Sequence, residues 1–307
     1  MRKMNFSGVG VALVTPFTEK KEINYNEFEK VCNYVMENGV DYLVVLGTTG
    51  ESVVLSKKEK QDLIKATVNI AKGKVPVVAG FGGNNTYKIA DELKSYELEG
   101  VDAILSVSPS YNKPTQEGIY EHYKVIANAT DLPIILYNVP SRTASNIKAT
   151  TTLQLAHEFK NIIGIKEATN DWNQITELCR NKPEGFFLIS GDDKLALPEI
   201  SIGFDGVISV IANATPRLFS TMIHRGMAND FVGARSILFE LDELITMLFE
   251  QGNPAGVKCA LEHLGICKDE LRLPLMPVNY DLRRRMGVKI ANLSKEFERL
   301  IGEKLNA

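Results

Sequence analysis

The chain has 307 residues, of which 44% are hydrophobic and 24% charged, and its formal net charge is −3. These values are typical of a globular enzyme of one large domain and exclude a disordered or fibrous protein. The negative net charge also indicates no basic surface for nucleic acid. The only dense run of like charge, Arg283 to Arg285, is too short to follow a phosphate backbone, and we interpret it as a solvated or interface patch.

Eight short β-branched runs recur along the chain, each followed by an amphipathic segment. In chain order the runs begin at Val9, Asp41, Val75, Asp102, Pro133, Ile162, Phe186 and Gly206. Nearly all are apolar at consecutive positions, as parallel strands are when both of their faces are buried. Eight evenly spaced βα units predict a closed (β/α)8 TIM barrel. A doubly wound sheet is the alternative, but it needs a topological switch point that the spacing does not show.

Helical patterns continue after the eighth unit to the end of the chain. Within the repeats, Ser56 and Glu59 form a capping box, which predicts that a helix begins there. Residues 230–307 carry further helical patterns, and no Gly/Ser-rich linker precedes them. We therefore expect residues 1–229 to form the barrel and residues 230–307 to form a helical extension packed on it, not an independent domain.

The cysteines and the apolar stretches bear on the compartment. The four cysteines lie far apart and form no C-x-x-C pair: Cys32, Cys179, Cys259 and Cys267. We interpret them as small hydrophobic side chains in a reducing compartment. The N-terminal apolar stretch is short and runs into Thr15-Pro16, unlike a signal peptide, and no run approaches the length of a membrane span. The expected location is the cytoplasm.

Polar residues at the strand ends are the candidates for chemistry, because a TIM barrel builds its active site at the C-terminal ends of its strands. Lys166 ends the sixth strand in IIGIKEA. Burial there disfavours the charged ammonium and leaves a neutral amine that can attack a carbonyl. Taken alone, the lysine is more simply interpreted as the partner of a carboxylate such as that of Glu167.

The segment GTTGES directly follows the second strand and contains Thr48 and Thr49. Its glycines allow backbone N–H groups to approach an anion, and two adjacent hydroxyls suit a carboxylate. A tight strand-to-helix turn rich in small residues is an equally simple interpretation.

A tyrosine and an arginine follow the fifth strand in YNVPSRT, at Tyr137 and Arg142. The tyrosine can pass a proton, and the guanidinium can hold a carboxylate through two hydrogen bonds. Each residue alone can also be an ordinary side chain of the barrel rim or surface. Their occurrence together favours a functional role.

Weaker signals complete the ring at the strand ends. Tyr111 lies in SPSYNKP after the fourth strand, Gly191 in SGDD after the seventh, and Ile208 in GVISVIAN at the eighth. SGDD is also an ordinary turn and helix cap. The four histidines lack metal-ligand spacing, and the glycines at 80–83 lack the third glycine of a dinucleotide loop, so we expect neither a metal nor an organic cofactor.

In this order, the motifs GTTGES, YNVPSRT, GIKEA and SGDD resemble the dihydrodipicolinate synthase family over essentially the whole chain. The wider N-acetylneuraminate lyase superfamily of class I aldolases shares the barrel, the Schiff-base lysine and the tyrosine. Arg142 resembles the synthase arginine that holds the carboxylate of the aldehyde substrate, and it favours the synthase. The alternatives are a pyruvate-dependent sugar-acid aldolase, of the N-acetylneuraminate lyase or keto-deoxy-gluconate type, and a non-catalytic binding barrel.

The resemblance implies a reaction. Lys166 would form a Schiff base with pyruvate, and the enamine would attack L-aspartate 4-semialdehyde to give 4-hydroxy-tetrahydrodipicolinate, in diaminopimelate and lysine biosynthesis. Tyr137 would shuttle protons with Thr48 and with Tyr111 of a neighbouring subunit. The protein would be a lyase with no metal or organic cofactor.

The resemblance also assigns the binding residues. Thr49 would bind the pyruvate carboxylate, Arg142 would hold the carboxylate of the aldehyde, and Gly191 and Ile208 would line the pocket with backbone groups. Because Tyr111 would serve a neighbouring subunit, we expect at least a homodimer and favour a homotetramer.

One departure from the family pattern concerns regulation. Lysine-inhibited relatives have histidines soon after GTTGES and a second tyrosine just before the one that matches Tyr111. This chain has Lys57 and Lys60 at the histidine positions, Ser110 at the tyrosine position, and Lys88 where an acidic residue would bind the effector's amine. Added positive charge should repel a cationic effector, so we expect weak or absent inhibition by lysine.

Overall fold

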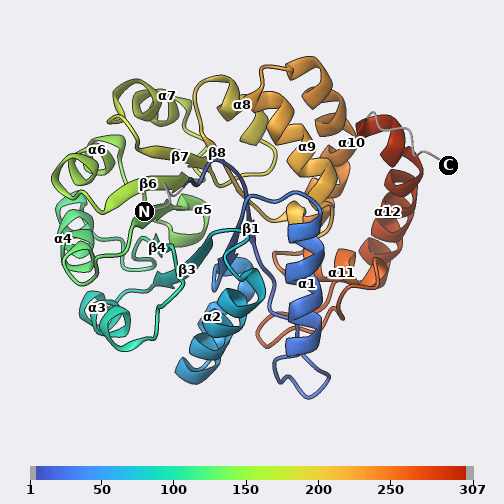
Figure 1. The fold of residues 1–307 in the computed structure, drawn as a ribbon, viewed down its shortest axis with the longest axis horizontal. Helices are drawn as coiled ribbons and strands as arrows, with labels where there is room; N and C mark the ends of the chain where they lie inside the picture. Colours follow the sequence, from blue (N-terminus) through green and yellow to red (C-terminus); the bar gives the residue numbers. More distant parts are fainter. Residues whose placement is uncertain (1–4, 302–307) are drawn as a thin grey trace.

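The structure, a computed structural model, describes residues 5–301 apart from the side chains of residues 297–299 and 301, and it contains a closed barrel of eight parallel strands. The strands are β1 Gly8–Ala12, β2 Tyr42–Val45, β3 Val77–Gly82, β4 Ala103–Val107, β5 Ile134–Asn138, β6 Ile162–Glu167, β7 Phe187–Ser190 and β8 Gly206–Ser209. Each strand pairs with the next, and β8 pairs with β1 (Figure 1). The predicted (β/α)8 barrel is confirmed, and each predicted run overlaps one strand, although β1 begins one residue before its run and β3 ends two residues after its run.

Helices surround the barrel. Those that follow the strands are α1 Tyr25–Glu37, α2 Lys57–Ala71, α3 Thr86–Ser95, α4 Gln116–Ala127, α6 Ala149–Glu158, α7 Trp172–Asn181, α8 Ala196–Ser201 and α9 Pro216–Met227. Short helical turns lie in the loops after β2, β5 and β8: η1 Thr48–Gly50, η2 Ser52–Val54, α5 Pro140–Thr143 and η3 Ile211–Asn213. The predicted capping box is present, since Ser56 Oγ accepts from Glu59 N at 3.2 Å and Glu59 Oε2 accepts from Ser56 N at 2.8 Å.

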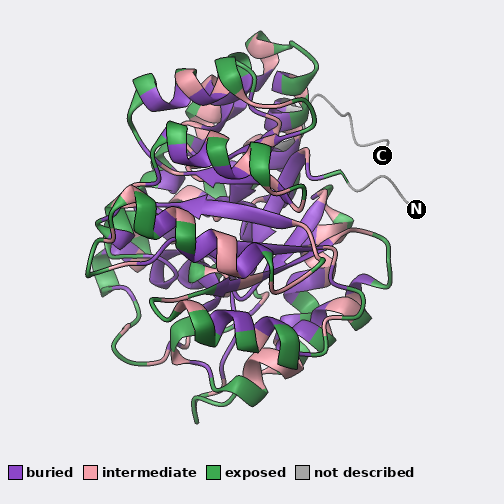
Figure 2. Ribbon diagram, turned by 90° about the vertical axis from the view of Figure 1, so that its left-hand side faces the viewer, coloured by how far each residue is buried: buried purple, intermediate pink, exposed green. Residues whose placement is uncertain are grey.

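The apolar side chains form two layers because successive residues of a strand point to opposite faces. One cluster fills the barrel and includes Val44, Ile135 and Ile189. Phe6 belongs to it and contacts the rings of Tyr42 and Phe187 edge-on, near the starts of β2 and β7. The second cluster lies between strands and helices, so the helices bury their inner faces and expose their outer ones (Figure 2).

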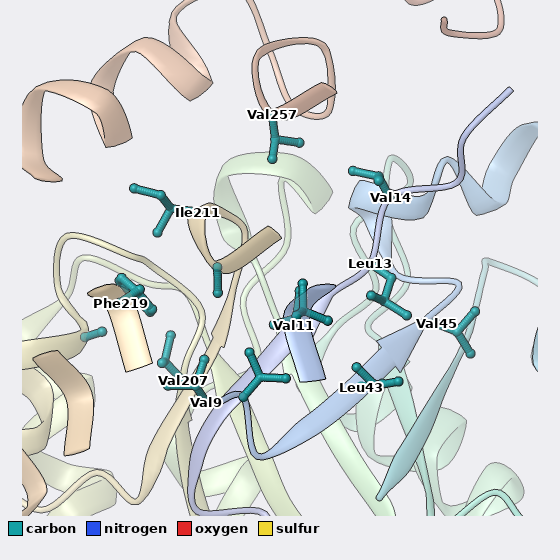
Figure 3. Packing of buried hydrophobic residues seen from close by; sticks show 14 of the residues in the cluster. Val9, Val11, Leu13, Val14, Leu43, Val45, Val207, Ile211, Phe219 and Val257 are labelled. Atoms are coloured by element: carbon teal, nitrogen blue, oxygen red, sulfur yellow. The ribbon is translucent and has the colours of Figure 1, made fainter. Parts of the chain in front are cut away.

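Three helices follow the last βα unit: α10 Phe231–Glu250, α11 Ala255–His263 and α12 Tyr280–Ile301. They lie together at one side of the barrel (Figure 1). Val257 of α11 joins the outer cluster together with Val14 and Ile211, above the end of β1 (Figure 3). Residues 302–307 of the predicted extension lie outside the described residues.

The arginine run on α12 is paired with acidic side chains. Arg283 forms ion pairs with Glu262 and Asp269, and Arg285 forms an ion pair with Glu250 at 2.5 Å. These contacts join α12 to α11 and to the end of α10. The run therefore contributes to packing within the chain.

The cysteines are free thiols, as expected from their spacing. Three of them are buried, while Cys179 is partly exposed. Within residues 5–301, no helix has both the length and the apolar character needed to cross a membrane.

A buried ion pair joins the extension to the loop after β2. Lys258 Nζ of α11 lies 2.6 Å from Glu51 Oε1, and the two side chains are 0% and 1% exposed. Lys258 Nζ also donates to Glu270 O at 2.7 Å, and Glu51 Oε2 accepts from Arg272 N at 3.1 Å. Burial lowers the pKa of Lys258, and the nearby Glu51 carboxylate partly offsets that effect.

Replacement of Lys258 by Met should leave the Glu51 carboxylate buried without a cation. We expect the free energy of unfolding to fall by about 3–5 kcal/mol, measured by urea denaturation. Lys268→Met, which removes an exposed pair with Glu19, is the matched control and should have a far smaller effect. A double variant, Glu51→Gln with Lys258→Met, should recover part of the loss. Equal losses in the two single lysine variants would contradict the prediction.

Candidate functional site

A cavity of about 460 Å³ opens at the C-terminal ends of the strands. Six of the residues predicted for the site line it: Thr48, Thr49, Tyr137, Arg142, Lys166 and Gly191. They come from the loops or ends of β2, β5, β6 and β7, segments far apart in the sequence. Closure of the barrel brings these strand ends to one rim.

Lys166 and Tyr137 are neighbours across adjacent strands. They are register partners of β6 and β5, so both side chains point into the barrel. Lys166 is 5% exposed, and its Nζ lies 4.4 Å from the centroid of the Tyr137 ring. No carboxylate in the described part of the chain lies within ion-pair distance of this amine. Lys166 is therefore not the partner of Glu167.

The Glu167 carboxylate lies on the outer face of β6, opposite to Lys166. It accepts from Asn138 Nδ2 at 2.8 Å, from Gln174 Nε2 at 2.9 Å and from Thr169 N at 2.9 Å. Burial raises the pKa of Glu167 to about 7, and the hydrogen bonds from Asn138 and Gln174 partly offset that rise. This network holds the ends of β5 and β6 together behind the two residues that face the cavity.

The same network reaches the loop that carries Arg142. Asn138 Oδ1 accepts from Ile147 N at 3.0 Å, and Asn138 Nδ2 donates to Asn146 Oδ1 at 2.7 Å. Arg142 lies between these anchors on α5, which begins at Pro140. Its guanidinium is exposed and forms no ion pair with any residue that the structure describes. The arginine is thus free to meet an anion at the cavity.

The turn after β2 brings two hydroxyls to the cavity wall. Thr48 and Thr49 lie in η1, and Glu51, with φ +53°, reverses the chain between η1 and η2. A positive φ is uncommon for a residue with a side chain, and the buried pair with Lys258 holds Glu51 in that conformation. Thr49 is 2% exposed, and its Oγ1 accepts from Asn253 Nδ2 at 2.9 Å.

The remaining predicted residues differ in position. Gly191 lines the cavity, where an added Cβ would lie only 2.6 Å from the Cβ of Ala168, so no larger residue fits without a shift. Ile208 is 1% exposed and lies in the apolar filling of the barrel, not on the cavity wall. Tyr111 is 88% exposed, has φ +67°, and does not line the cavity of its own chain.

A second hollow of about 320 Å³ adjoins the first. Thr48, Tyr137 and Arg142 line both, so the hollow leads to the same three side chains. Ser110 and Lys60 also line it. Two adjoining spaces therefore share these three side chains as a wall.

Part of the cavity wall was missed by the sequence analysis. It comes from α10 and the segment after it: Ile245, Thr246, Phe249, Glu250 and Asn253. The search was limited to strand ends, whereas these residues follow the last strand. The Asn-Pro pair at Asn253-Pro254 indicates a turn before a helix, but it carries no sign of a contact with Thr49.

No metal site was expected from the sequence, and the relevant observation is how the possible metal-ligating side chains are arranged. Across residues 5–301, the structure has no group of three or more His, Cys, Asp or Glu side chains arranged to hold a metal ion. The four histidines lie apart on α4, α6, α9 and α11.

Comparisons with known proteins agree with this arrangement. A profile of the dihydrodipicolinate synthetase family matches residues 5–293. A 4-hydroxy-tetrahydrodipicolinate synthase of Parabacteroides distasonis is 50% identical over 277 residues, covering 90% of this chain and 93% of the relative. The dihydrodipicolinate synthase of Aquifex aeolicus has a solved structure with a TM-score of 0.90 and 40% identity, covering 95% of this chain and 98% of that one.

A third relative was solved with a ligand. The chloride-inhibited dihydrodipicolinate synthase of Acinetobacter baumannii, complexed with pyruvate, has a TM-score of 0.91 and 37% identity, covering 94% of this chain and 99% of that one. The family profile matches residues 5–293, and each of the three relatives matches at least 90% of this chain. The chain belongs to the dihydrodipicolinate synthetase family.

Proposed function

We propose that the protein is a 4-hydroxy-tetrahydrodipicolinate synthase that condenses pyruvate with L-aspartate 4-semialdehyde through a Schiff base on Lys166. The observation that carries the proposal is the environment of Lys166. Its amine is buried at the ring of Tyr137, it has no carboxylate partner among the described residues, and it faces a cavity walled by hydroxyls and a guanidinium.

The proposed chemistry begins with the neutral amine of Lys166. The amine attacks the carbonyl carbon of pyruvate, and loss of water gives an imine. The imine draws electrons from the adjacent methyl group, so a proton leaves and an enamine forms. The enamine carbon then bonds to the aldehyde carbon of the second substrate. The substrate's own amine finally attacks the imine carbon, which closes the ring and releases Lys166.

The other cavity residues supply proton transfer and charge recognition. Tyr137 lies beside Lys166 and would carry protons, together with Thr48, which also lines the cavity wall. Thr49 would hold the pyruvate carboxylate, and Arg142 would hold the carboxylate of the aldehyde through a charge-assisted hydrogen-bonded pair. Gly191 would contribute backbone groups, whereas Ile208 lies in the apolar filling of the barrel and is given no binding role. No metal or organic cofactor takes part in the proposed reaction.

We further propose that the working unit is at least a homodimer, with a homotetramer favoured. Tyr111 is highly exposed and lines neither the cavity nor the second hollow of its own chain, and the second hollow leads to Thr48 and Tyr137. Val53, which is 92% exposed, stands at the wall of this hollow. A second subunit that covers this apolar rim would bring its own Tyr111 into the hollow and complete the proton path.

The charges around the second hollow support the proposal that lysine inhibits weakly or not at all. Lys60 lines it, while Lys57 donates to Ser95 and lies over the ring of Tyr96, another lining residue. Glu92 is the acidic residue that lines the hollow, and it lies 3.9 Å from Lys88 of α3. A cationic effector would therefore meet Lys60 and a carboxylate that is already paired.

The remaining proposals concern organisation. We propose that residues 1–229 form the catalytic barrel, that residues 230–307 form its helical extension, and that the protein works in the cytoplasm.

Borohydride reduction in the presence of pyruvate should add one pyruvate-derived group to the wild-type chain, at Lys166, as detected by peptide mass spectrometry. Lys166→Ala should abolish the adduct, because the amine that forms the imine is gone. Lys160→Ala, an exposed lysine at the opposite end of the barrel, is the control and should be labelled fully. If the wild type is not labelled, the Schiff-base mechanism fails.

Arg142→Ala should separate the two substrates. In a coupled assay, kcat/KM for aspartate semialdehyde should fall about 100-fold, because a charge-assisted pair with its carboxylate is lost. Pyruvate trapping should change little. Arg180→Ala, an exposed arginine on α7, is the control. Equal losses in both assays would mean that Arg142 does not hold the aldehyde. If the wild type were active with a sugar acid and not with aspartate semialdehyde, the sugar-acid aldolase would be favoured.

Mixed dimers should reveal which chain Tyr111 serves. Lys166→Ala and Tyr111→Phe chains should each be nearly inactive as pure proteins. Co-expressed, they should recover about a quarter of wild-type activity, because half of random dimers are mixed and each mixed dimer has one complete site. If Tyr111 served its own chain, no dimer would have a complete site, and the mixture would stay inactive.

A further inference from the structure

Asn253 links the helical extension to the wall of the proposed pyruvate site. Its side-chain amide donates from Nδ2 to Thr49 Oγ1 at 2.9 Å, and both residues line the same cavity. Asn253 is 7% exposed, and its Oδ1 has no hydrogen-bond partner among residues 5–301. The contact with Thr49 is therefore the only side-chain hydrogen bond that the structure gives this amide.

The direction of that bond constrains the threonine hydroxyl. A hydroxyl has one hydrogen to donate and two lone pairs to accept with. When Thr49 Oγ1 accepts from an amide, one lone pair is occupied and the hydrogen is left to point elsewhere. Within the described part of the chain, the Thr49 hydroxyl donates to no protein acceptor. The hydrogen is available to an anion in the cavity.

A second contact fixes the distance between the two segments. Glu51 follows Thr49 on the same turn, and Asn253 precedes α11, which carries Lys258. The buried ion pair between Glu51 and Lys258 measures 2.6 Å. The turn and the extension are thus held at two points, one charged and buried, and one at the cavity surface. Neither segment can shift without breaking a buried contact.

We propose that Asn253 is a positioning residue that holds Thr49 Oγ1 as an acceptor and so directs its hydroxyl hydrogen to the carboxylate of the keto acid bound at Lys166. This rests on the proposed function, because it needs an anion next to Lys166. The Glu51–Lys258 pair keeps Asn253 in reach of Thr49. Asn253 acts through Thr49 and makes no bond to the reacting atoms.

The test is a double-mutant cycle on pyruvate kinetics. Asn253→Ala should raise KM for pyruvate about tenfold with kcat within about twofold, because an oriented hydrogen bond to a charged group is weakened. Thr49→Val should raise it at least as much. In the Thr49→Val background, Asn253→Ala should add almost nothing, because the hydroxyl it orients is absent.

An isosteric variant separates positioning from packing. Asn253→Asp keeps the shape, but its ionised carboxylate can only accept hydrogen bonds. It would therefore accept the hydrogen of the Thr49 hydroxyl and raise KM for pyruvate more than Asn253→Ala does. That difference should also shrink in the Thr49→Val background. Asn161→Ala removes an amide that donates to two backbone carbonyls at the other end of the barrel, and it should lower the melting temperature without changing KM.

Three outcomes would overturn the proposal. They are an unchanged KM for pyruvate in Asn253→Ala, an equal rise with and without the Thr49 hydroxyl, and a rise in KM for Asn161→Ala that matches the one for Asn253→Ala. Failure of the proposed function is distinct, because borohydride with pyruvate would then leave the wild-type chain unlabelled.

Discussion

The buried ion pair between Glu51 and Lys258 is the interaction on which the site depends. Two charges removed from water are tolerated only when each is paired and further hydrogen-bonded, and Glu270 O and Arg272 N supply those bonds here. The pair is geometrically demanding, so it fixes the loop after β2 against α11. Since that loop carries the cavity hydroxyls, the extension takes part in shaping the site as well as in covering the barrel.

The two faces of β5 and β6 carry groups with different roles. Inside the barrel, Tyr137 and Lys166 face the cavity as register partners. Outside it, their neighbours Asn138 and Glu167 form a buried polar network that extends to Gln174. Strand alternation makes the division automatic, because a residue that faces the cavity must be followed by one that faces the helices. Rigidity behind the strands thus supports the positions of the groups in front.

The sequence predicted what depends on local pattern and missed what depends on tertiary contact. Doubly buried parallel strands are apolar along their whole length, so the eight strands and their order followed from the sequence. The position of Lys166 at the end of a strand also followed, whereas the absence of a carboxylate partner among the described residues did not. Asn253 could not be found in this way, because its partner Thr49 is 204 positions away and only the packing of α11 brings them together. In the same way, nothing in AGVKCALE marks Lys258 as fully buried.

The charge balance of the cavity follows from these contacts. Among the charged groups that line it, Lys194 pairs with Asp242 at 2.8 Å and Glu250 pairs with Arg285 at 2.5 Å. Asp192 caps a turn, since its Oδ1 accepts from Lys194 N at 2.8 Å. The amine and guanidinium that remain without an ion-pair partner in the described chain are those of Lys166 and Arg142. A cavity whose acidic groups are engaged, while an amine and a guanidinium have no ion-pair partner among the described residues, is suited to small molecules that each carry a carboxylate.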